Sequence, residues 1–121
     1  MDLIKREYHI ALFETYKELL TEKQKEYFIL SYFEDLTLSE IAENLSVSRN
    51  AAFDQIKKTV SILEDYESKL KVYQRNLSLE QFADKLSQEL KEELLSIIKE
   101  WYYGIWRTIK PLTNGLTSCN W

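Results

Sequence analysis

The sequence predicts an all-α fold, and three observations support this class. The chain has 121 residues, the size of one domain, of which 45% are hydrophobic and 30% are charged. Two Gly and one Pro leave little room for the tight turns that join β-strands. The spacing Ser/Thr-x-x-Glu/Gln, typical of a helix N-terminus, recurs along the chain ahead of apolar residues at helical spacing. We therefore expect several helices joined by short connections.

The first two helices are expected over residues 3–20 and from Thr21 onward. Asp2 is placed to cap the first helix. Its apolar residues recur at helical spacing: Ile4, Tyr8, Leu12, Tyr16 and Leu19. Thr21 and Gln24 have the capping-box spacing at the start of the second helix. Its apolar cluster is Tyr27, Phe28, Ile29, Tyr32 and Phe33, and the aromatic side chains of this cluster are expected to seed the core.

A helix-turn-helix is predicted at residues 37–58. Thr37 and Glu40 form a capping-box spacing for its first helix, the segment 46–48 interrupts that helix, and Ser48 is a good N-cap for the next one. Close crossing of the two helices needs small and apolar side chains on their inner faces. The predicted motif core is Ile41, Ala42, Leu45, Val47, Ala52 and Ile56. Ser46 stands where such turns commonly place Gly, and a left-handed backbone there costs on the order of 1 kcal/mol.

The helix after the turn is expected to be long. Nothing in the local sequence stops it between Arg49 and Arg75, which corresponds to about 40 Å at 1.5 Å per residue. Apolar residues recur every seventh position in its far half and beyond: Ile56, Leu63, Leu70 and Leu77, with Thr59, Tyr66 and Tyr73 between them. This stripe indicates packing either against the first helix or against a second protomer, and both can hold together.

The C-terminal part is expected to add a further helix and a tail. Ser78 and Gln81 form another capping-box spacing, and the helix is expected to reach Tyr103 with a break near residues 88–92. The predicted organisation is a helical domain at 1–76, a helical extension at 77–105 that packs on it or on a partner protomer, and an irregular tail at 106–121. The aromatic cluster at 101–106 favours burial in the core or a dimer over base stacking or a membrane surface.

Several function classes lack their characteristic residues. His9 is the only histidine, and neither a Cys/His metal cluster nor the motifs G-x-x-x-x-G-K-[ST] and G-x-S-x-G occur. We therefore expect no enzyme activity, no cofactor and no metal, and a structural role for His9. Cys119 is the lone cysteine, and no apolar run approaches the ~20 residues that cross a bilayer, so a cytoplasmic protein is expected. The net charge of −4 requires any nucleic-acid site to be local.

The stretch LTEKQKEYFILSYFEDLTLSEIAENLSVSRNAAFDQIKKT resembles region 4 of bacterial sigma factors. Together with the following SILEDYESKL, it is similar to the YlxM-type family, also called UPF0122. The similarity covers roughly Ala11 to Tyr73 and is carried by LT-x-KQ, L-x-EIA and SR-x-A-x-x-D-x-IK-x-T. The resemblance implies an all-helical homodimer without catalytic activity. It also implies a regulatory role in the signal recognition particle pathway, because family members are typically encoded beside the particle's protein subunit or its receptor.

The resemblance also points to candidate contact residues early in the recognition helix. Arg49 matches an arginine often found in sigma region 4, and Asn50 can pair bidentately with adenine. Phe53 and Asp54 stand where the housekeeping sigma factors commonly have Arg and Gln. The full candidate set is Arg49, Asn50, Phe53, Asp54, Lys57 and Lys58.

Two hypotheses follow for this set. In the first, a dimeric regulator inserts the Arg49 to Lys58 face into duplex DNA. Between Thr37 and Val60 the three cations equal the three carboxylates, so the expected affinity for DNA is low unless a dimer presents two helices about one DNA turn apart. In the second, the motif is a scaffold that contacts the protein or RNA of the particle, with Phe53 as an exposed apolar anchor.

Overall fold

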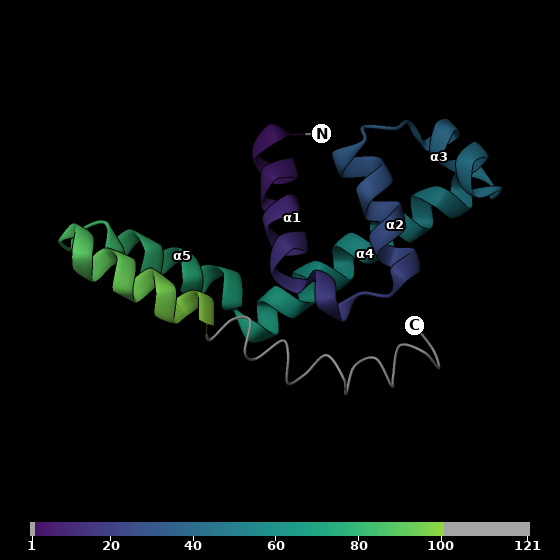
Figure 1. Cartoon of the computed structure of the whole chain (residues 1–121). Helices are drawn as coiled ribbons and strands as arrows, with labels where there is room; N and C mark the ends of the chain where they lie inside the picture. The colour runs from purple at the N-terminus through teal and green to yellow at the C-terminus, as the bar shows by residue number, and fades with distance from the viewer. Residues whose placement is uncertain (1, 101–121) are drawn as a thin grey trace. The chain divides into compact units, whose positions relative to one another are not determined.

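The structure is a computed structural model that describes residues 2–100. Its helices fall into two compact units, one ending at Lys69 and the other beginning at Leu70 (Figure 1). All regular structure in residues 2–100 is helical, which confirms the predicted all-α class. The predicted tail at 106–121, the aromatic cluster at 101–106 and Cys119 lie outside the described residues.

The first unit contains four α-helices and two short irregular helical turns. Its elements are α1 (Leu3–Tyr16), the 3₁₀ turn η1 (Lys17–Leu19), α2 (Glu22–Phe28), the π turn η2 (Ile29–Phe33), α3 (Leu38–Leu45) and α4 (Arg49–Leu70). The first helix therefore ends before residue 20, since its last predicted turn tightens into η1. Leu20 and Thr21 alone connect η1 to α2, as the sequence predicts.

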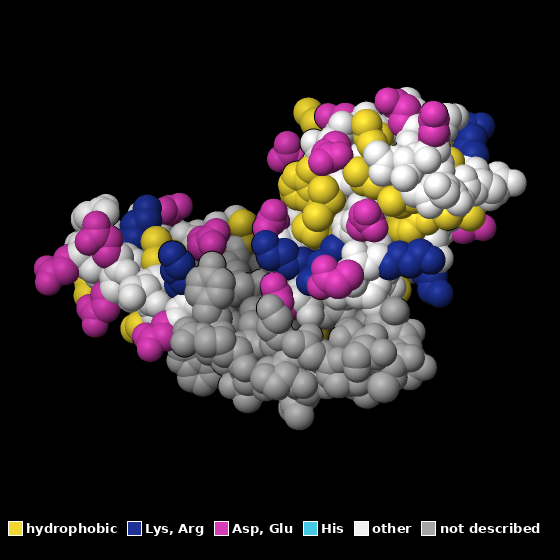
Figure 2. Space-filling view, turned by 45° about the vertical axis from the view of Figure 1, so that its right-hand side comes forward, with side chains coloured by type: hydrophobic (Ala, Val, Ile, Leu, Met, Phe, Trp, Pro, Cys, Tyr) yellow, Lys and Arg dark blue, Asp and Glu magenta, His cyan; other side chains and the backbone are white. Residues whose placement is uncertain are grey.

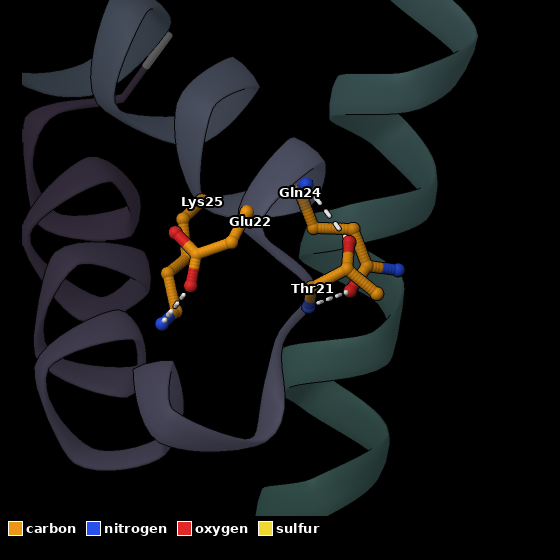
Figure 3. Close-up of polar contacts among 4 residues, drawn as sticks. All are labelled: Thr21, Glu22, Gln24 and Lys25. Carbon is orange, nitrogen blue, oxygen red and sulfur yellow. Dashed lines mark hydrogen bonds and ion pairs between the residues drawn. The ribbon is translucent and has the colours of Figure 1, made fainter. Parts of the chain in front are cut away.

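Side-chain caps define where the first helices begin. The Asp2 carboxylate accepts a hydrogen bond from the Ile4 N–H at 3.2 Å. At the start of α2, the Gln24 N–H donates to Thr21 Oγ1 at 3.1 Å, and the Thr21 N–H donates to Gln24 Oε1 at 2.9 Å (Figure 3). Both predicted caps are confirmed. Each bond satisfies an N–H group that has no partner inside the helix.

Aromatic side chains from α1, α2 and η2 form one part of the core. The Phe28 ring stacks on Phe13 at 4.4 Å between centroids and on Tyr32 at 4.2 Å. Tyr27, Phe28 and Tyr32 are buried as predicted, but the fourth aromatic of the cluster, Phe33, is 45% exposed, and its apolar neighbour Ile29 is 38% exposed. The π turn accounts for this difference, because its wider winding, in which the Glu34 N–H donates to the Ile29 carbonyl, changes the direction of successive side chains.

The apolar stripe predicted for the first helix is only partly buried. Leu12, Tyr16 and Leu19 lie in the core, but Ile4 is 79% exposed and Tyr8 is 40% exposed. His9 and Phe13 are buried instead. The inner face of α1 is thus rotated from the predicted one, because His9 contacts Tyr32 and α4 rather than solvent.

The long helix is shorter than the sequence predicts. It ends at Leu70, where Lys71 adopts a left-handed backbone (φ 54°, ψ 32°), and α5 (Val72–Ala83) follows directly. The predicted continuation to Arg75 is therefore wrong. The predicted helix start at Ser78 is also wrong, because that residue lies inside α5. No side-chain hydrogen bond caps the start of α5, so the break between α4 and α5 could not be predicted from a capping motif.

The second half of α4 packs against α1. The Tyr16 hydroxyl donates to Glu67 Oε1 at 2.5 Å, and the rings of Tyr16 and Tyr66 lie 5.9 Å apart. Leu63 is fully buried, but Leu70 is 52% exposed, so the seven-residue repeat does not form a continuous buried seam. The intrachain alternative is thus realised, and the second protomer stays a prediction.

The second unit is described from Leu70 to residue 100. After α5, residues 84–87 form a turn and residues 88–100 are helical, so the break predicted near 88–92 occurs slightly earlier. Lys91 Nζ pairs with Asp84 Oδ1 at 2.7 Å across this turn. Ala83 is the one buried residue in this described part, and several large apolar side chains are exposed: Leu70, Leu77, Phe82, Leu90 and Ile97. Within residues 2–100, none of the helices combines the length and apolar character that crossing a bilayer requires.

Candidate nucleic-acid or partner interface

The turn between α3 and α4 depends on a left-handed residue. Thr37 and Glu40 cap α3 reciprocally, at 3.2 and 3.0 Å, as predicted. Ser46 then adopts φ 56° and ψ 43°. The Val47 N–H donates to the Ala42 carbonyl at 2.9 Å, and the Ser46 N–H donates to the Glu43 carbonyl at 3.3 Å. This pair of hydrogen bonds is a Schellman motif, which satisfies carbonyls at the helix end and turns the chain sharply.

Ser48 starts the next helix immediately after this turn. Its Oγ accepts a hydrogen bond from the Ala51 N–H at 3.0 Å, and α4 begins at Arg49. The predicted N-cap is therefore confirmed. Residues 40–58 form two helices joined by a bend, not one continuous rod.

The two helices of the motif share a hydrophobic cluster with α2, η2 and the connection that follows η2. Its buried members are Tyr27, Leu30, Ile41, Ala42 and Ala52, and Leu36, Leu45, Val47 and Ile56 pack against it while partly buried. The structure thus brings all six predicted motif-core residues together. Ala52 is fully buried where α4 crosses its neighbours, a position at which a larger side chain would separate the helices.

The six candidate contact residues lie on the solvent side of α4. All are exposed: Arg49, Asn50, Phe53, Asp54, Lys57 and Lys58. Their spacing of one, three and four positions keeps them on one broad face of the helix. Lys57 Nζ lies 5.9 Å from the centroid of the Phe53 ring, a cation–π distance that covers part of an apolar side chain which is 49% exposed. The face therefore combines three cations, one carboxylate and one aromatic ring.

A groove runs between this face and α1. It is open to solvent, has a volume of about 460 Å³, and is lined by Lys5, His9, Tyr32, Phe53, Ile56, Lys57, Val60, Ser61 and Glu64. Figure 2 shows that hydrophobic side chains are exposed among charged groups on the surface of the first unit. The groove is not predictable from local sequence, because its α1 and α4 walls are far apart in the chain.

Polar contacts join three of the side chains that line the groove. His9 Nδ1 lies 3.1 Å from the Tyr32 hydroxyl, and His9 Nε2 lies 3.0 Å from Glu64 Oε1. Burial raises the pKa of the Tyr32 hydroxyl, an effect opposed by the positive charge of Arg6 and reinforced by the negative charge of Glu64. His9 therefore has a structural role between α1, η2 and α4. The described residues contain no cluster of three or more His, Cys, Asp or Glu side chains placed to hold a metal ion.

The bent helix pair, its Schellman turn and its shared core define a helix-turn-helix protein. The chain belongs to the UPF0122 family, whose profile, described as "Putative helix-turn-helix protein, YlxM / p13 like", matches residues 3–100. This match extends beyond the Ala11 to Tyr73 stretch that carries the sequence resemblance.

Curated relatives have similar lengths and substantial identity. A UPF0122 protein of Limosilactobacillus reuteri (strain DSM 20016) is 49% identical over 90 residues, which cover 74% of this chain and 80% of the relative. One of Staphylococcus epidermidis is 45% identical over 95 residues, covering 78% and 86%. One of Bacillus mycoides (strain KBAB4) is 48% identical over 82 residues, covering 68% and 74%.

Proposed function

We propose that this chain is a regulatory helix-turn-helix protein of the signal recognition particle pathway, and that it acts by binding duplex DNA through the exposed face of α4. The observation that carries the DNA-binding part is the bend at Ser46 to Ser48, after which Arg49, Asn50 and the two lysines face solvent on one helix. Binding rather than catalysis, without cofactor or metal, fits a surface of this composition.

The proposed pathway rests on the family. Members of the YlxM type are typically encoded beside the protein subunit of the particle or its receptor, and that neighbourhood supports a cytoplasmic role in the same pathway. We further propose a homodimer. The exposed apolar side chains of the second unit, such as Phe82 at 54% and Leu90 at 53%, support a second copy as their partner. In a dimer, binding of one recognition helix raises the effective concentration of the second helix near the same DNA, which increases the overall affinity.

The exposed charges of α4 determine how strongly the affinity for DNA is expected to depend on salt. Arg49, Lys57 and Lys58 give α4 three exposed cations, and Asp54 opposes them. If each cation neutralises one phosphate, log K falls with log salt with a slope of about −3 per protomer. The affinity is therefore expected to be measurable at low salt and to weaken sharply as salt rises.

The test is a titration of the full chain with duplex DNA, particle RNA and the particle's protein subunit at several salt concentrations. Arg49→Ala and Lys58→Glu are expected to weaken DNA binding and to reduce the salt slope by about 1 or more. Lys23→Glu, which alters an exposed lysine of α2, is the matched control and is expected to change affinity by less than about twofold. Absence of DNA binding at low salt would remove the support for this function.

A second candidate function is an interaction scaffold that contacts the particle's protein or RNA. The observation that favours it is Phe53, an aromatic side chain that is 49% exposed in the middle of the contact face. Phe53→Ala is expected to abolish capture of the particle components while circular dichroism stays unchanged, because the ring contributes little to the core. Capture at the original level would count against the scaffold.

A further inference from the structure

The groove between α1 and α4 extends past the face that the proposed function uses. Phe53 and Lys57 belong to both surfaces, but Lys5 comes from α1, and Val60 and Ser61 lie farther along α4. Arg49, Asn50 and Lys58 do not line the groove. The groove therefore overlaps the contact face at Phe53 and Lys57, and the rest of its lining lies outside that face.

Apolar side chains dominate one wall of the groove. Phe53, Ile56 and Val60 follow one another at i, i+3 and i+7 along α4 and leave an apolar strip that is partly open to solvent. Such a strip gains stability from covering by apolar side chains at a matching spacing, as in the packing of an amphipathic helix into a groove. A phosphate backbone gains nothing from the same strip.

The charges around the strip favour an anionic ligand. Lys5 and Lys57 line opposite walls, and neither forms an ion pair with another residue in the described part of the chain. The carboxylate of Glu64, by contrast, already has His9 as its partner. With His9 counted as neutral, the two lysines exceed this one carboxylate, so the lining of the groove has a net positive charge, although the whole chain carries a net charge of −4.

We propose that this groove binds an acidic amphipathic protein segment. Apolar side chains of the segment cover Phe53, Ile56 and Val60, and its carboxylates face Lys5 and Lys57. A nucleic acid fits less well, since Phe53, Ile56 and Val60 make the wall on α4 apolar. The small volume, about 460 Å³, suits a few side chains, so an affinity on the order of 10–100 μM is expected.

The experiment uses the full chain and two synthetic helical peptides of about 16 residues. The first has Leu and Phe at i, i+3 and i+7 with Glu at the flanking positions, and the second has Lys in place of every Glu. Binding is followed by amide chemical shifts in ¹⁵N-labelled protein. The acidic peptide is expected to shift the signals of Lys5, Phe53, Val60 and Ser61, and the basic peptide is expected to leave them in place.

Two charge reversals provide a matched pair. Lys5→Glu removes a groove cation, and Lys58→Glu removes another exposed lysine, on α4, that does not line the groove. Lys5→Glu is expected to lower the affinity for the acidic peptide about three- to tenfold, and Lys58→Glu is expected to lower it less than about twofold. Phe53→Ala is expected to weaken it at least about tenfold through loss of the aromatic contact.

Three outcomes would overturn the proposal: no shifts at the groove, equal binding of the two peptides, or equal losses in the two lysine variants. A duplex DNA arm addresses the alternative ligand. If Lys5→Glu lowers the affinity for DNA as much as the affinity for the peptide, the groove cations belong to a phosphate-binding site and the proposal fails. Retained peptide binding in a chain that does not bind DNA supports the groove and counts only against the DNA-binding function.

Discussion

Replacing Ser46 by Gly tests the geometry on which the motif depends. Ser46 has φ 56° and ψ 43°, a conformation in which a residue with a Cβ atom loses about 1–2 kcal/mol relative to right-handed backbone. Gly removes most of that cost but makes the unfolded chain more flexible, which costs part of the gain. The net expectation for Ser46→Gly is a stabilisation of about 0.5–1 kcal/mol.

The assay is thermal and urea unfolding followed by circular dichroism. For a cooperative unit of this size, the expected gain corresponds to a rise in Tm of about 2–6 °C. Ser61→Gly is the matched control, since Ser61 is exposed in the middle of α4, where Gly is expected to cost about 0.5 kcal/mol. Opposite signs for the two substitutions are the predicted signature. If Ser46→Gly is neutral or destabilising, the turn is not left-handed and the inferred bend between α3 and α4 is wrong.

Two further predictions concern hydrogen bonds. Tyr16→Phe removes the hydroxyl that donates to the buried Glu67 carboxylate, so urea unfolding should show a loss of about 1–3 kcal/mol. Hydrogen bonds with the Thr37 backbone, and to a smaller extent with the Thr37 side chain, lower the pKa of the Glu40 carboxyl. The ionised carboxylate therefore stabilises the folded chain above the unfolded-state pKa, and this stabilisation is lost as pH falls through the lower folded-state pKa. Glu40→Gln keeps the capping-box geometry and should flatten this acid dependence in unfolding curves measured from pH 7 down to about pH 3.

Each of these two predictions has its own control. Tyr66→Phe alters a partly buried tyrosine of α4 whose hydroxyl forms no hydrogen bond within the described residues, and it should change stability by less than about 0.5 kcal/mol. A loss of the same size in both tyrosine variants would mean that the hydroxyl of Tyr16 has no special role. The control for the acid dependence is Glu43→Gln. Glu43 is an exposed carboxyl of the same helix, but it does not belong to the capping box of Thr37 and Glu40. Identical pH profiles for the two glutamine variants would contradict the assignment to Glu40.

Local sequence predicted the helix starts well because caps link residues that are near in the chain. Thr21 with Gln24, Thr37 with Glu40, and Ser48 with Ala51 each join positions three apart, so the hydrogen bonds need no distant partner. The same spacing at Ser78 and Gln81 was misleading, since both residues lie inside α5. A capping pattern shows that a helix can begin at a position, not that the preceding chain is irregular.

The candidate site was predicted in part. Helical periodicity placed Phe53, Lys57 and the other contact candidates on the outer side of α4, where the structure has them exposed. The groove beside them was not predicted, because Lys5 and His9 reach it from α1 across more than forty residues of sequence. The burial of His9 likewise depends on Tyr32 and Glu64, which the chain brings together only when it folds.

The sequence by itself determined the helical class, the bend after α3 and the outward face of the recognition helix, because capping and periodicity act within a few residues. Only the tertiary structure decided which side of α1 is buried, that α4 ends at Leu70 before the left-handed Lys71, and that a cationic groove with an apolar wall lies between α1 and α4. The physical reason is range. Burial and grooves arise from contacts between segments distant in the chain, and their cost or gain cannot be assigned to any short stretch.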